Sequence, residues 1–446
     1  MEYVLAIDIG ASSGRHILGW MEHNKLQMQE VHRFHNQIIH RQGRDIWDID
    51  QLYKEVVLGM KKCASIYKIP KSVAIDTWAC DFVLCDDQGN RLCECVAYRD
   101  ARVCGWMERA FKVMKQDVLY QRTGIQFQTF NTLYQCLALR QEEPDIFQRA
   151  DHFLMVPDYL NYRLCGIFAN EYTNATTTQM VHASYKAWDE EILSAFALPK
   201  HIFHPLRKPG EILGHLTRDV IEEVGYDCVV KVCASHDTGS AFAAVAKKDT
   251  ILISSGTWSL VGVLNEQSNC SSTACQLNFT NEGGANHSIR FLKNIMGLWM
   301  IQEVRHCYDD AYSFAQFVEM ARACQSFPSI IEVNEERFLH PENMVKEIQN
   351  SCLETSQQVP VTPGEIAYCI YHSLALAYQK AIQEIMQIQK KVYTTIHIFG
   401  GGCQNELLNE LVHELTHMEV YVGPVEATAI GNLRIQLDEN KNKEVL

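Results

Sequence analysis

The sequence lacks the features of membrane proteins and of disulfide-rich secreted proteins. No apolar run is long enough to span a bilayer. The N-terminus, MEYVLAIDIG, has neither the basic residues nor the apolar core of a signal peptide. The 17 cysteines are scattered without a CxxC pair, so the spacing of a zinc site is missing. We therefore expect a cytoplasmic protein with free thiols and no membrane partner.

The sequence also has fewer basic than acidic residues. Lys and Arg number 40 against 54 Asp and Glu, and the formal net charge is −14. A field of that sign opposes binding to a phosphate backbone, so we expect no nucleic-acid partner. The GxxxxGK[ST] motif of P-loop enzymes is absent as well. A small anionic ligand remains compatible, because a local site can hold the opposite charge.

No low-complexity linker divides the 446 residues, although this length exceeds a single core. Residues 2–10 and 15–21 are typical of two strands joined by a loop of small residues. The stretch DTILISSGTWSLVGVLN, at 249–265, repeats this pattern. The repetition predicts two similarly built halves, which we place at 1–242 and 243–446, with a ligand-binding cleft between them.

Other segments have a clear local pattern. Residues 25–34 favour a third strand, and 72–92 favour strands with a turn at 86–90. Residues 48–67 have helical spacing, with Asp48 or Asp50 as the N-cap. The middle of the chain, from about residue 100 to 225, is helical and rich in loops.

The first loop, in AIDIGASSGR, suggests a phosphate site. Small residues from Gly10 to Gly14 leave backbone N–H groups free to bind anionic oxygens. Asp8 would repel a bare phosphate, so its position implies Mg²⁺ held through water. Ser12, Ser13 and Arg15 could add donors. The alternative is an ordinary hairpin with a polar turn.

Two later glycine turns extend this interpretation. SSGTWS, from Ser254 to Ser259, could hold the polyphosphate from a second side. HIFGGGCQN has bare backbone at Gly400 to Gly402, which would let a base or ribose approach closely. For Gly400 to Gly402, the alternative is an ordinary turn between a strand and the helical segment 405–415.

One acid stands out for chemistry. Asp237, in VVKVCASHDTGSAFAAVA, lies where a buried strand pattern meets a small-residue helix. The helix N-terminus favours the ionised carboxylate, which could align a substrate hydroxyl and take its proton. The alternative is a helix N-cap without a catalytic role.

These motifs carry a resemblance. DIGASSGR, SHDTGS, SSGTWSL and GGGCQN together resemble the phosphate, catalytic and adenosine motifs of the FGGY carbohydrate kinases, which belong to the actin-like ATPase superfamily. The resemblance implies an α/β fold of two actin-like (ribonuclease H-like) domains, each a mixed sheet flanked by helices. The first would hold the sugar and the phosphate loop, and the second would hold the nucleotide.

Further stretches resemble the members that act on L-rhamnulose: IDTWACDFVL, AYRDAR, GIQFQTFNTLYQ, EYTNATTTQ, TNEGGA, LKNIMGLW and GPVEATAIGN. They imply phosphorylation of the 1-hydroxyl of L-rhamnulose by ATP with Mg²⁺, in L-rhamnose catabolism. Two alternatives remain: a kinase of another ketose, such as L-fuculose or a pentulose, and an inactive or regulatory relative. We expect a monomer or a weak homo-oligomer.

The resemblance also assigns residues, with Asp237 as general base. The sugar-binding residues would be Ala79, His236, Asp237, Thr238 and Asn294. The ATP-binding residues would be Ala11, Ser12, Ser13, Gly14, Arg15, Thr257, Gln302 and Gly401. Asp8 would lie behind the water shell of the Mg²⁺ ion.

Some features depart from the family pattern or leave a choice open. TWACD has Ala79 where the family usually has glycine, which could narrow the sugar pocket. Members typically continue beyond LRIQLDENKNKEVL with helical sequence, so we expect the second domain to lack some packing. Cys352 and Cys369 fall where relatives can carry a close cysteine pair. Trp78 could stack on a sugar or pack in the core.

Overall fold

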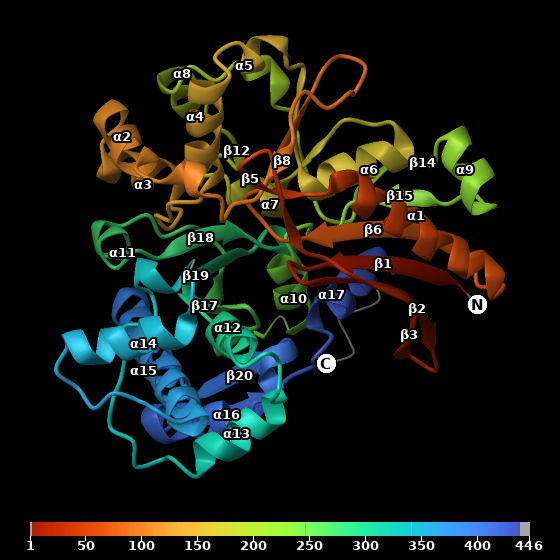
Figure 1. The fold of residues 1–446 in the computed structure, drawn as a ribbon. Coiled ribbons are helices and arrows are strands. Elements are labelled where there is room, and N and C mark those ends of the chain that lie inside the picture. Colours follow the sequence, from red (N-terminus) through yellow and green to blue (C-terminus); the bar gives the residue numbers. More distant parts are fainter. Residues whose placement is uncertain (1, 246, 340, 438–446) are drawn as a thin grey trace. The chain divides into compact units, whose positions relative to one another are not determined.

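The computed structural model describes residues 2–245, 247–339 and 341–437. The chain forms two compact units (Figure 1). Unit 1 comprises Met1–Ala246, Asn265–Arg290 and Thr428–Leu446, and unit 2 comprises Lys247–Leu264 and Phe291–Ala427. The division expected from the sequence has one boundary, after residue 242, whereas unit 1 takes in two later segments of the chain.

The main sheet of unit 1 has the strand order β14-β15-β6-β1-β2-β3. Its strands are β1 (Tyr3–Ile9), β2 (Ser13–Glu22), β3 (Lys25–His35), β6 (Pro70–Thr77), β14 (Ile212–His215) and β15 (Val229–Lys231). β6 is parallel to β1 and to β15, whereas the β1–β2, β2–β3 and β14–β15 pairs are antiparallel. The sheet is therefore mixed, which confirms the prediction.

Helices and short strands complete unit 1. The helices are α1 (Ile49–Ser65), α2 (Trp106–Val113), α3 (Gln116–Thr123), α4 (Thr132–Glu142), α5 (Ile146–Arg149), α6 (Val156–Cys165), α7 (Tyr172–Thr176), α8 (Glu190–Ala195), α9 (Arg218–Val224), α10 (Asp237–Val245), α11 (Ser272–Gln276) and α17 (Ala427–Gln436). The short strands are β4 (Ile38–Arg41), β5 (Arg44–Trp47), β7 (Phe82–Cys85), β8 (Cys95–Val96), β9 (His152–Met155), β10 (Asn170–Glu171), β11 (Val181–His182), β12 (Ala187–Trp188), β13 (Leu206–Arg207) and β18 (Thr280–Gly283).

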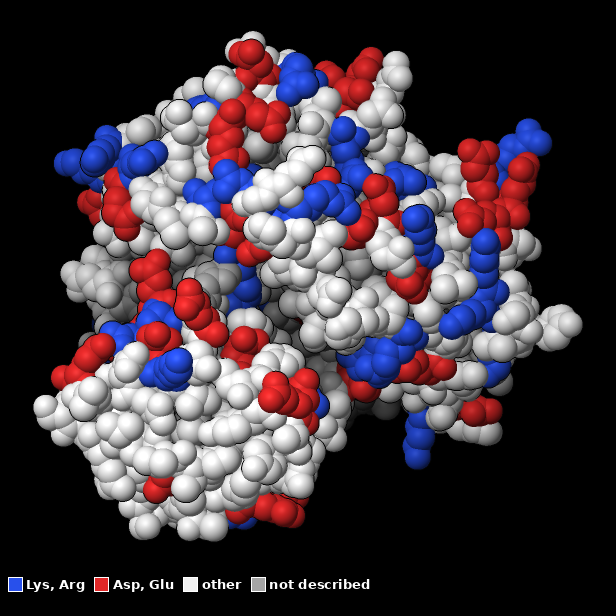
Figure 2. Space-filling view, in the orientation of Figure 1, with Lys and Arg blue, Asp and Glu red and all other residues white. Residues whose placement is uncertain are grey.

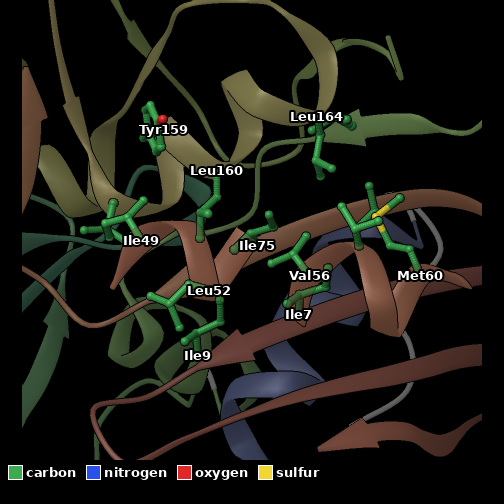
Figure 3. Packing of buried hydrophobic residues seen from close by; sticks show 14 of the residues in the cluster. Ile7, Ile9, Ile49, Leu52, Val56, Met60, Ile75, Tyr159, Leu160 and Leu164 are labelled. Carbon is green, nitrogen blue, oxygen red and sulfur yellow. The ribbon is translucent and has the colours of Figure 1, made fainter. Parts of the chain in front are cut away.

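Helices cover both faces of this sheet. Successive side chains of a strand point to opposite faces. Ile7 and Ile9 of β1 belong to the apolar cluster that α1 and α6 complete (Figure 3). Val4, on the other face, shares a cluster with Leu433 of α17. A strand that is buried on both faces reads as a continuous apolar run, which explains the pattern of VLAIDI.

The local predictions for the first part of the chain are confirmed with two refinements. Asp48 is the N-cap of α1, since its side chain accepts a hydrogen bond from the backbone N–H of Gln51. The strand character of 72–92 is divided, because β6 ends at Thr77 and β7 begins at Phe82. The turn at 86–90 is present, and the side chain of Asp86 accepts its backbone N–H groups.

Unit 2 repeats the strand plan of unit 1. Its strands lie in the order β19-β17-β16-β20-β21. They are β16 (Ile251–Ser255), β17 (Trp258–Asn265), β19 (Ile289–Met296), β20 (Thr395–Phe399) and β21 (Glu419–Val422). The antiparallel hairpin β16–β17 corresponds to β1–β2, and the parallel strands β20 and β21 correspond to β6 and β15. The prediction that one hairpin unit occurs twice is confirmed.

The helices of unit 2 are α12 (Trp299–Cys307), α13 (Phe314–Arg322), α14 (Met344–Glu354), α15 (Pro363–Gln389) and α16 (Glu406–Thr416). No helix among the described residues of the chain is long and apolar enough to cross a bilayer. Acidic and basic side chains are interspersed over the face shown in Figure 2.

The contact between α17 and α10 offers a test of the fold. A Cβ atom at Gly431 of α17 would lie 1.8 Å from the carbonyl oxygen of Ser240 in α10. The substitution Gly431→Ala must therefore push the two helices apart, and we expect it to lower the free energy of unfolding by about 2 kcal/mol. Urea denaturation of the variant beside the parent protein measures this loss.

Gly214→Ala is the matched control for this experiment. A Cβ atom at Gly214, in β14, would meet Ile167 at 3.5 Å, which is an ordinary van der Waals distance. We expect this variant to unfold close to the parent midpoint. Equal midpoints for both variants would contradict the close approach of α17 and α10.

Candidate functional site

The loop between β1 and β2 is a tight turn held by the end of β3. The backbone N–H of Gly10 donates to the carbonyl of Ser13 at 2.9 Å. The side-chain amide of Asn36 donates to the carbonyl of Gly10 at 2.8 Å, and the N–H of Asn36 donates to the carbonyl of Ser12 at 3.1 Å. The turn predicted from its small residues is therefore present and has a defined backbone.

Acidic side chains gather at one edge of the unit 1 sheet. Asp8 on β1 and Asp76 on β6 are register neighbours on parallel strands. Asp237 begins α10, after β15, the next parallel strand. The carboxyl ends of parallel strands meet at the same edge of a sheet, so these three acids share one region. Arg15 pairs with Asp8 there, with 2.8 Å between Nη2 and Oδ2.

Asp76 is the buried member of this group. Burial raises its pKa well above the usual value, and the Asp8 and Asp237 carboxylates raise it further. The amide of Asn432 in α17 opposes this by donating to Asp76 Oδ2 at 2.5 Å. Asp76 Oδ1 has no hydrogen-bond partner among the described residues. Three acids therefore lie close together at this edge, and one carboxyl oxygen of Asp76 has no donor among the described residues.

Such a group of acids fits a hydrated divalent cation. Among the residues that the structure describes, no group of three His, Cys, Asp or Glu side chains is placed to hold a metal ion directly. Mg²⁺ usually takes only one or two protein carboxylates and completes its shell with water and substrate phosphates. The acids at this edge therefore fit a divalent cation such as Mg²⁺ that is bound mostly through water, and Asp8 lies just before the turn between β1 and β2.

The start of α10 shows how Asp237 is held. The carbonyl of His236 accepts from the N–H groups of Gly239 and Ser240, at 2.7 and 3.1 Å. Asp237 Oδ1 instead accepts from the N–H and the hydroxyl of Thr238. An N-cap side chain accepts from the N–H two or three residues further on, so the geometry does not match the N-cap alternative. The Asp237 side chain is 30% exposed and can meet a ligand.

Glu171 fastens the segment just before Asp237. Its buried carboxylate accepts from the N–H and the hydroxyl of Ser235, at 3.1 and 2.7 Å. It also accepts from the N–H groups of Thr173 and Asn174, where it caps α7. The polar stretch EYTNATTTQ therefore serves in part to hold the loop that carries His236 and Asp237.

Ala79 lies beside the same loop. The amide of Asn174 donates to the carbonyls of Ser235 and Trp78, at 3.3 and 3.5 Å. Thr77 and His236 form a parallel β-bridge. The structure therefore brings together four of the five predicted sugar-binding residues: Ala79, His236, Asp237 and Thr238. The fifth, Asn294, lies on the part of β19 that belongs to unit 2.

Trp78 packs in the core of unit 1. Its side chain is only 6% exposed, and its ring lies 4.1 Å from that of Trp47. Both indole N–H groups donate to the buried Asp81 carboxylate. Of the two roles considered for Trp78, the contacts favour core packing.

The predicted ATP-binding residues of unit 2 lie around the β16–β17 turn. The carbonyl of Thr257 accepts from the N–H groups of Gly297 and Trp299, where α12 begins. Gln302 is on this helix, and its N–H donates to the carbonyl of Leu298. A Cβ atom at Gly400 would lie 2.8 Å from the carbonyl oxygen of Ser255, which also brings Gly401 beside the turn.

The cysteine pair suggested by the family lies in unit 2. Cys352 in α14 and Cys369 in α15 are buried free thiols. A hydrogen bond between the two side chains lowers the pKa of Cys352.

Asp76, Glu171 and Asn432 were missed as site residues from the sequence. For Asp76 a signal was present, since AID ends an apolar strand at 6–8 and again at 74–76. For Glu171 and Asn432 the sequence pattern was less informative, because their hydrogen-bond partners, Ser235 and Asp76, lie 64 and 356 residues away in the chain.

Comparison with known proteins gives concordant results. The family models of the FGGY family of carbohydrate kinases match residues 3–244 with the N-terminal domain and 251–437 with the C-terminal domain. The rhamnulokinase of Halalkalibacterium halodurans is 53% identical over 98% of this chain and 93% of its own length. The rhamnulokinase of Bacillus subtilis is 44% identical over 97% of this chain and 89% of its own length.

Solved structures agree on the fold. The ligand-bound xylulose kinase from Lactobacillus acidophilus superposes with a TM-score of 0.79 at 14% identity, over 98% of this chain and 89% of that one. Plasmodium falciparum glycerol kinase with ADP superposes with a TM-score of 0.77 at 14% identity, over the same shares of the two chains. The two-domain α/β prediction is confirmed.

The buried Asp76 generates a test of the acidic cluster. Its raised pKa means that the folded protein keeps a proton that the unfolded chain releases. The stability contribution of Asp76 is therefore present below its usual pKa, and it is lost as the pH rises toward the folded value. Asp76→Asn has no such proton, so its advantage in unfolding free energy over the parent should grow as the pH rises above about 4, the usual pKa of an aspartate.

Urea denaturation at several pH values measures this difference. Asp87→Asn, at an exposed position, is the control, and its difference from the parent should stay small throughout. An Asp76→Asn advantage that shrinks as the pH rises would show that Asp76 is ionised in the folded protein.

Proposed function

Since the chain belongs to the FGGY family of carbohydrate kinases, we propose that it transfers the γ-phosphoryl group of ATP to the 1-hydroxyl of L-rhamnulose. The products are ADP and L-rhamnulose 1-phosphate, within L-rhamnose catabolism. Nearly full-length similarity to rhamnulokinases supports the substrate. The structural observation that carries the chemistry is the acidic cluster of Asp8, Asp76 and Asp237 beside a phosphate-type turn.

Asp237 is the general base of the proposed reaction. The 1-hydroxyl oxygen attacks the γ-phosphorus, its proton passes to the Asp237 carboxylate, and the bond to the β–γ bridging oxygen breaks as ADP leaves. The two Thr238 donors hold Asp237 Oδ1, so the carboxylate has a fixed direction. His236, Thr238, Asn294 and the backbone at Ala79 bind the sugar.

The residues predicted to bind ATP keep their roles in the proposed reaction. The loop from Ala11 to Arg15 and the side chain of Thr257 contact the phosphates, while Gln302 and Gly401 contact the rest of ATP. A bound Mg²⁺ ion would neutralise charge on the β- and γ-phosphates. Asp8 would hold its water shell, and Arg15 restrains Asp8 for this task.

For the oligomeric state and the cellular compartment, we propose what the sequence predicts. We keep a monomer or a weak homo-oligomer as the proposed state. The cytoplasm stays the proposed compartment, because all 17 cysteines are free thiols and free thiols persist in reducing surroundings.

The catalytic role of Asp237 can be tested by Asp237→Asn. The amide keeps the size and an acceptor oxygen but cannot take a proton, so kcat for L-rhamnulose should fall at least about a hundredfold. A coupled ADP-release assay measures turnover, and a melting curve of the same preparation verifies folding. Asp227→Asn, an exposed acid that pairs with His215, is the control and should keep parent turnover.

A panel of ketoses in the same assay separates this function from its alternatives. L-fuculose or a pentulose used in preference to L-rhamnulose would assign another ketose. A folded Asp237→Asn variant with near-normal turnover would remove Asp237 from the mechanism. An absence of turnover on every ketose, with ATP still bound, would favour the regulatory alternative.

The phosphate contact of Thr257 has its own test. Thr257→Val keeps the shape of the side chain and removes the hydroxyl donor. We expect ATP binding to weaken by about 1 kcal/mol, with sugar binding kept. Isothermal titration calorimetry with each ligand separates the two effects, and an unchanged ATP affinity would count against this contact.

A further inference from the structure

A buried ion network lies behind His236 in unit 1. Arg290 is fully buried, and its Nε donates to the carbonyl of Gly283 at 2.9 Å. Its Nη2 lies 3.1 Å from Glu282 Oε2 and 3.0 Å from His236 Nδ1. A buried guanidinium is costly unless it is paired, so a network at this position calls for an explanation beyond packing.

The charges of the network compensate one another. Burial lowers the pKa of Arg290, and the Glu282 carboxylate makes the largest opposing contribution, followed by Asp237. The guanidinium also lies near the ring of Phe242, which belongs to α10, with 5.8 Å between the Arg290 Cζ and the ring centroid. Arg290 is thus held by partners on several sides, and the direction of its Nη2 is defined.

The contact between Arg290 and His236 favours one assignment of the imidazole nitrogens. A guanidinium has N–H donors and no acceptor. His236 Nδ1 also lies 3.3 Å from Glu282 Oε2, a carboxylate oxygen that can only accept. The contact with Arg290 is the shorter of the two, so we assign Nδ1 as the acceptor and place the ring hydrogen on Nε2. His236 Nε2 lies 3.5 Å from Asp237 Oδ1, on the side of the proposed base.

We propose that Arg290 is a positioning residue, which with Glu282 holds His236 as a donor through Nε2 beside Asp237. This inference rests on the proposed function, in which His236 binds the sugar. A histidine held in this form can donate to a sugar oxygen or to the Asp237 carboxylate, but it cannot take the proton of the 1-hydroxyl through Nε2. Arg290 thereby leaves the base role to Asp237 and fixes which sugar group His236 can recognise.

The side-chain geometry requires arginine. The planar guanidinium contacts the Gly283 carbonyl, Glu282 and His236 with donors in fixed directions. A lysine would keep the positive charge opposite Glu282, but its single ammonium group cannot reproduce this fork. Arg290→Lys therefore separates the positioning role from simple charge compensation.

A double-mutant cycle tests whether Arg290 acts through His236. We expect Arg290→Lys to lower kcat/KM for L-rhamnulose at least about tenfold, while ATP affinity is kept. In a His236→Ala background the same substitution should cost less than about twofold, because the residue that it positions is gone. Equal losses in both backgrounds would overturn the proposal.

Arg434→Lys is the matched control. Arg434 is a half-buried arginine of the same unit, and it donates to the carbonyl of Ala244 rather than to a side chain of the site. We expect this variant to keep the parent kcat/KM. Melting curves of all variants are compared, since a merely structural role of Arg290 would lower stability without depending on His236.

Nitrogen NMR of the protein with ¹⁵N-labelled histidine gives a readout that needs neither turnover nor a variant at Arg290. The His236 signals are assigned from their loss in His236→Ala. We expect hydrogen on Nε2 and none on Nδ1 in the parent protein, and a mixture of tautomers in Arg290→Lys. Hydrogen on Nδ1 in the parent would overturn the proposal, whatever sugar the protein phosphorylates, whereas failure to use L-rhamnulose with the expected tautomer would overturn only the proposed substrate.

Discussion

Placing three acids together at one edge of the unit 1 sheet costs free energy, and much of the surrounding structure offsets this cost. Asp8 and Asp76 are neighbours on parallel strands, and Asp237 follows the next strand. Burial raises the pKa of Asp76, and the nearby Asp8 and Asp237 carboxylates raise it further. Such a cluster persists only where donors restrain the carboxyl groups, and Arg15 and Asn432 are among these donors.

This requirement gives the last described helix of the chain a role in the site. The amide of Asn432, on α17, donates to Asp76 and to the carbonyl of Ala74 on the same strand. Gly431, on the same helix, permits the close approach to Ser240 of α10 that the side chain of another residue would prevent. One helix therefore packs against the sheet, restrains a buried acid and contacts the helix that begins with Asp237.

The loop around His236 and Asp237 is also restrained by buried polar side chains. Glu171 collects donors from Ser235 and from the start of α7, and Arg290 meets the imidazole of His236. Buried polar groups are stable only when they are hydrogen-bonded, and a satisfied network permits little movement. The loop is thus held by polar side chains from several segments, which suits a site where reacting groups need fixed directions.

The sequence by itself determined the elements with a local cause. Apolar runs predicted β1, β16 and their hairpin partners, because these strands are buried on both faces. Helical spacing with an N-cap predicted α1, and the order of the motifs identified the family. Only the tertiary structure decided that Trp78 packs in the core, that Asp237 is not bonded as an N-cap, and that Asn432 restrains Asp76. These outcomes depend on contacts between residues far apart in the chain, and no local pattern of side chains records which distant partner a buried polar group will find.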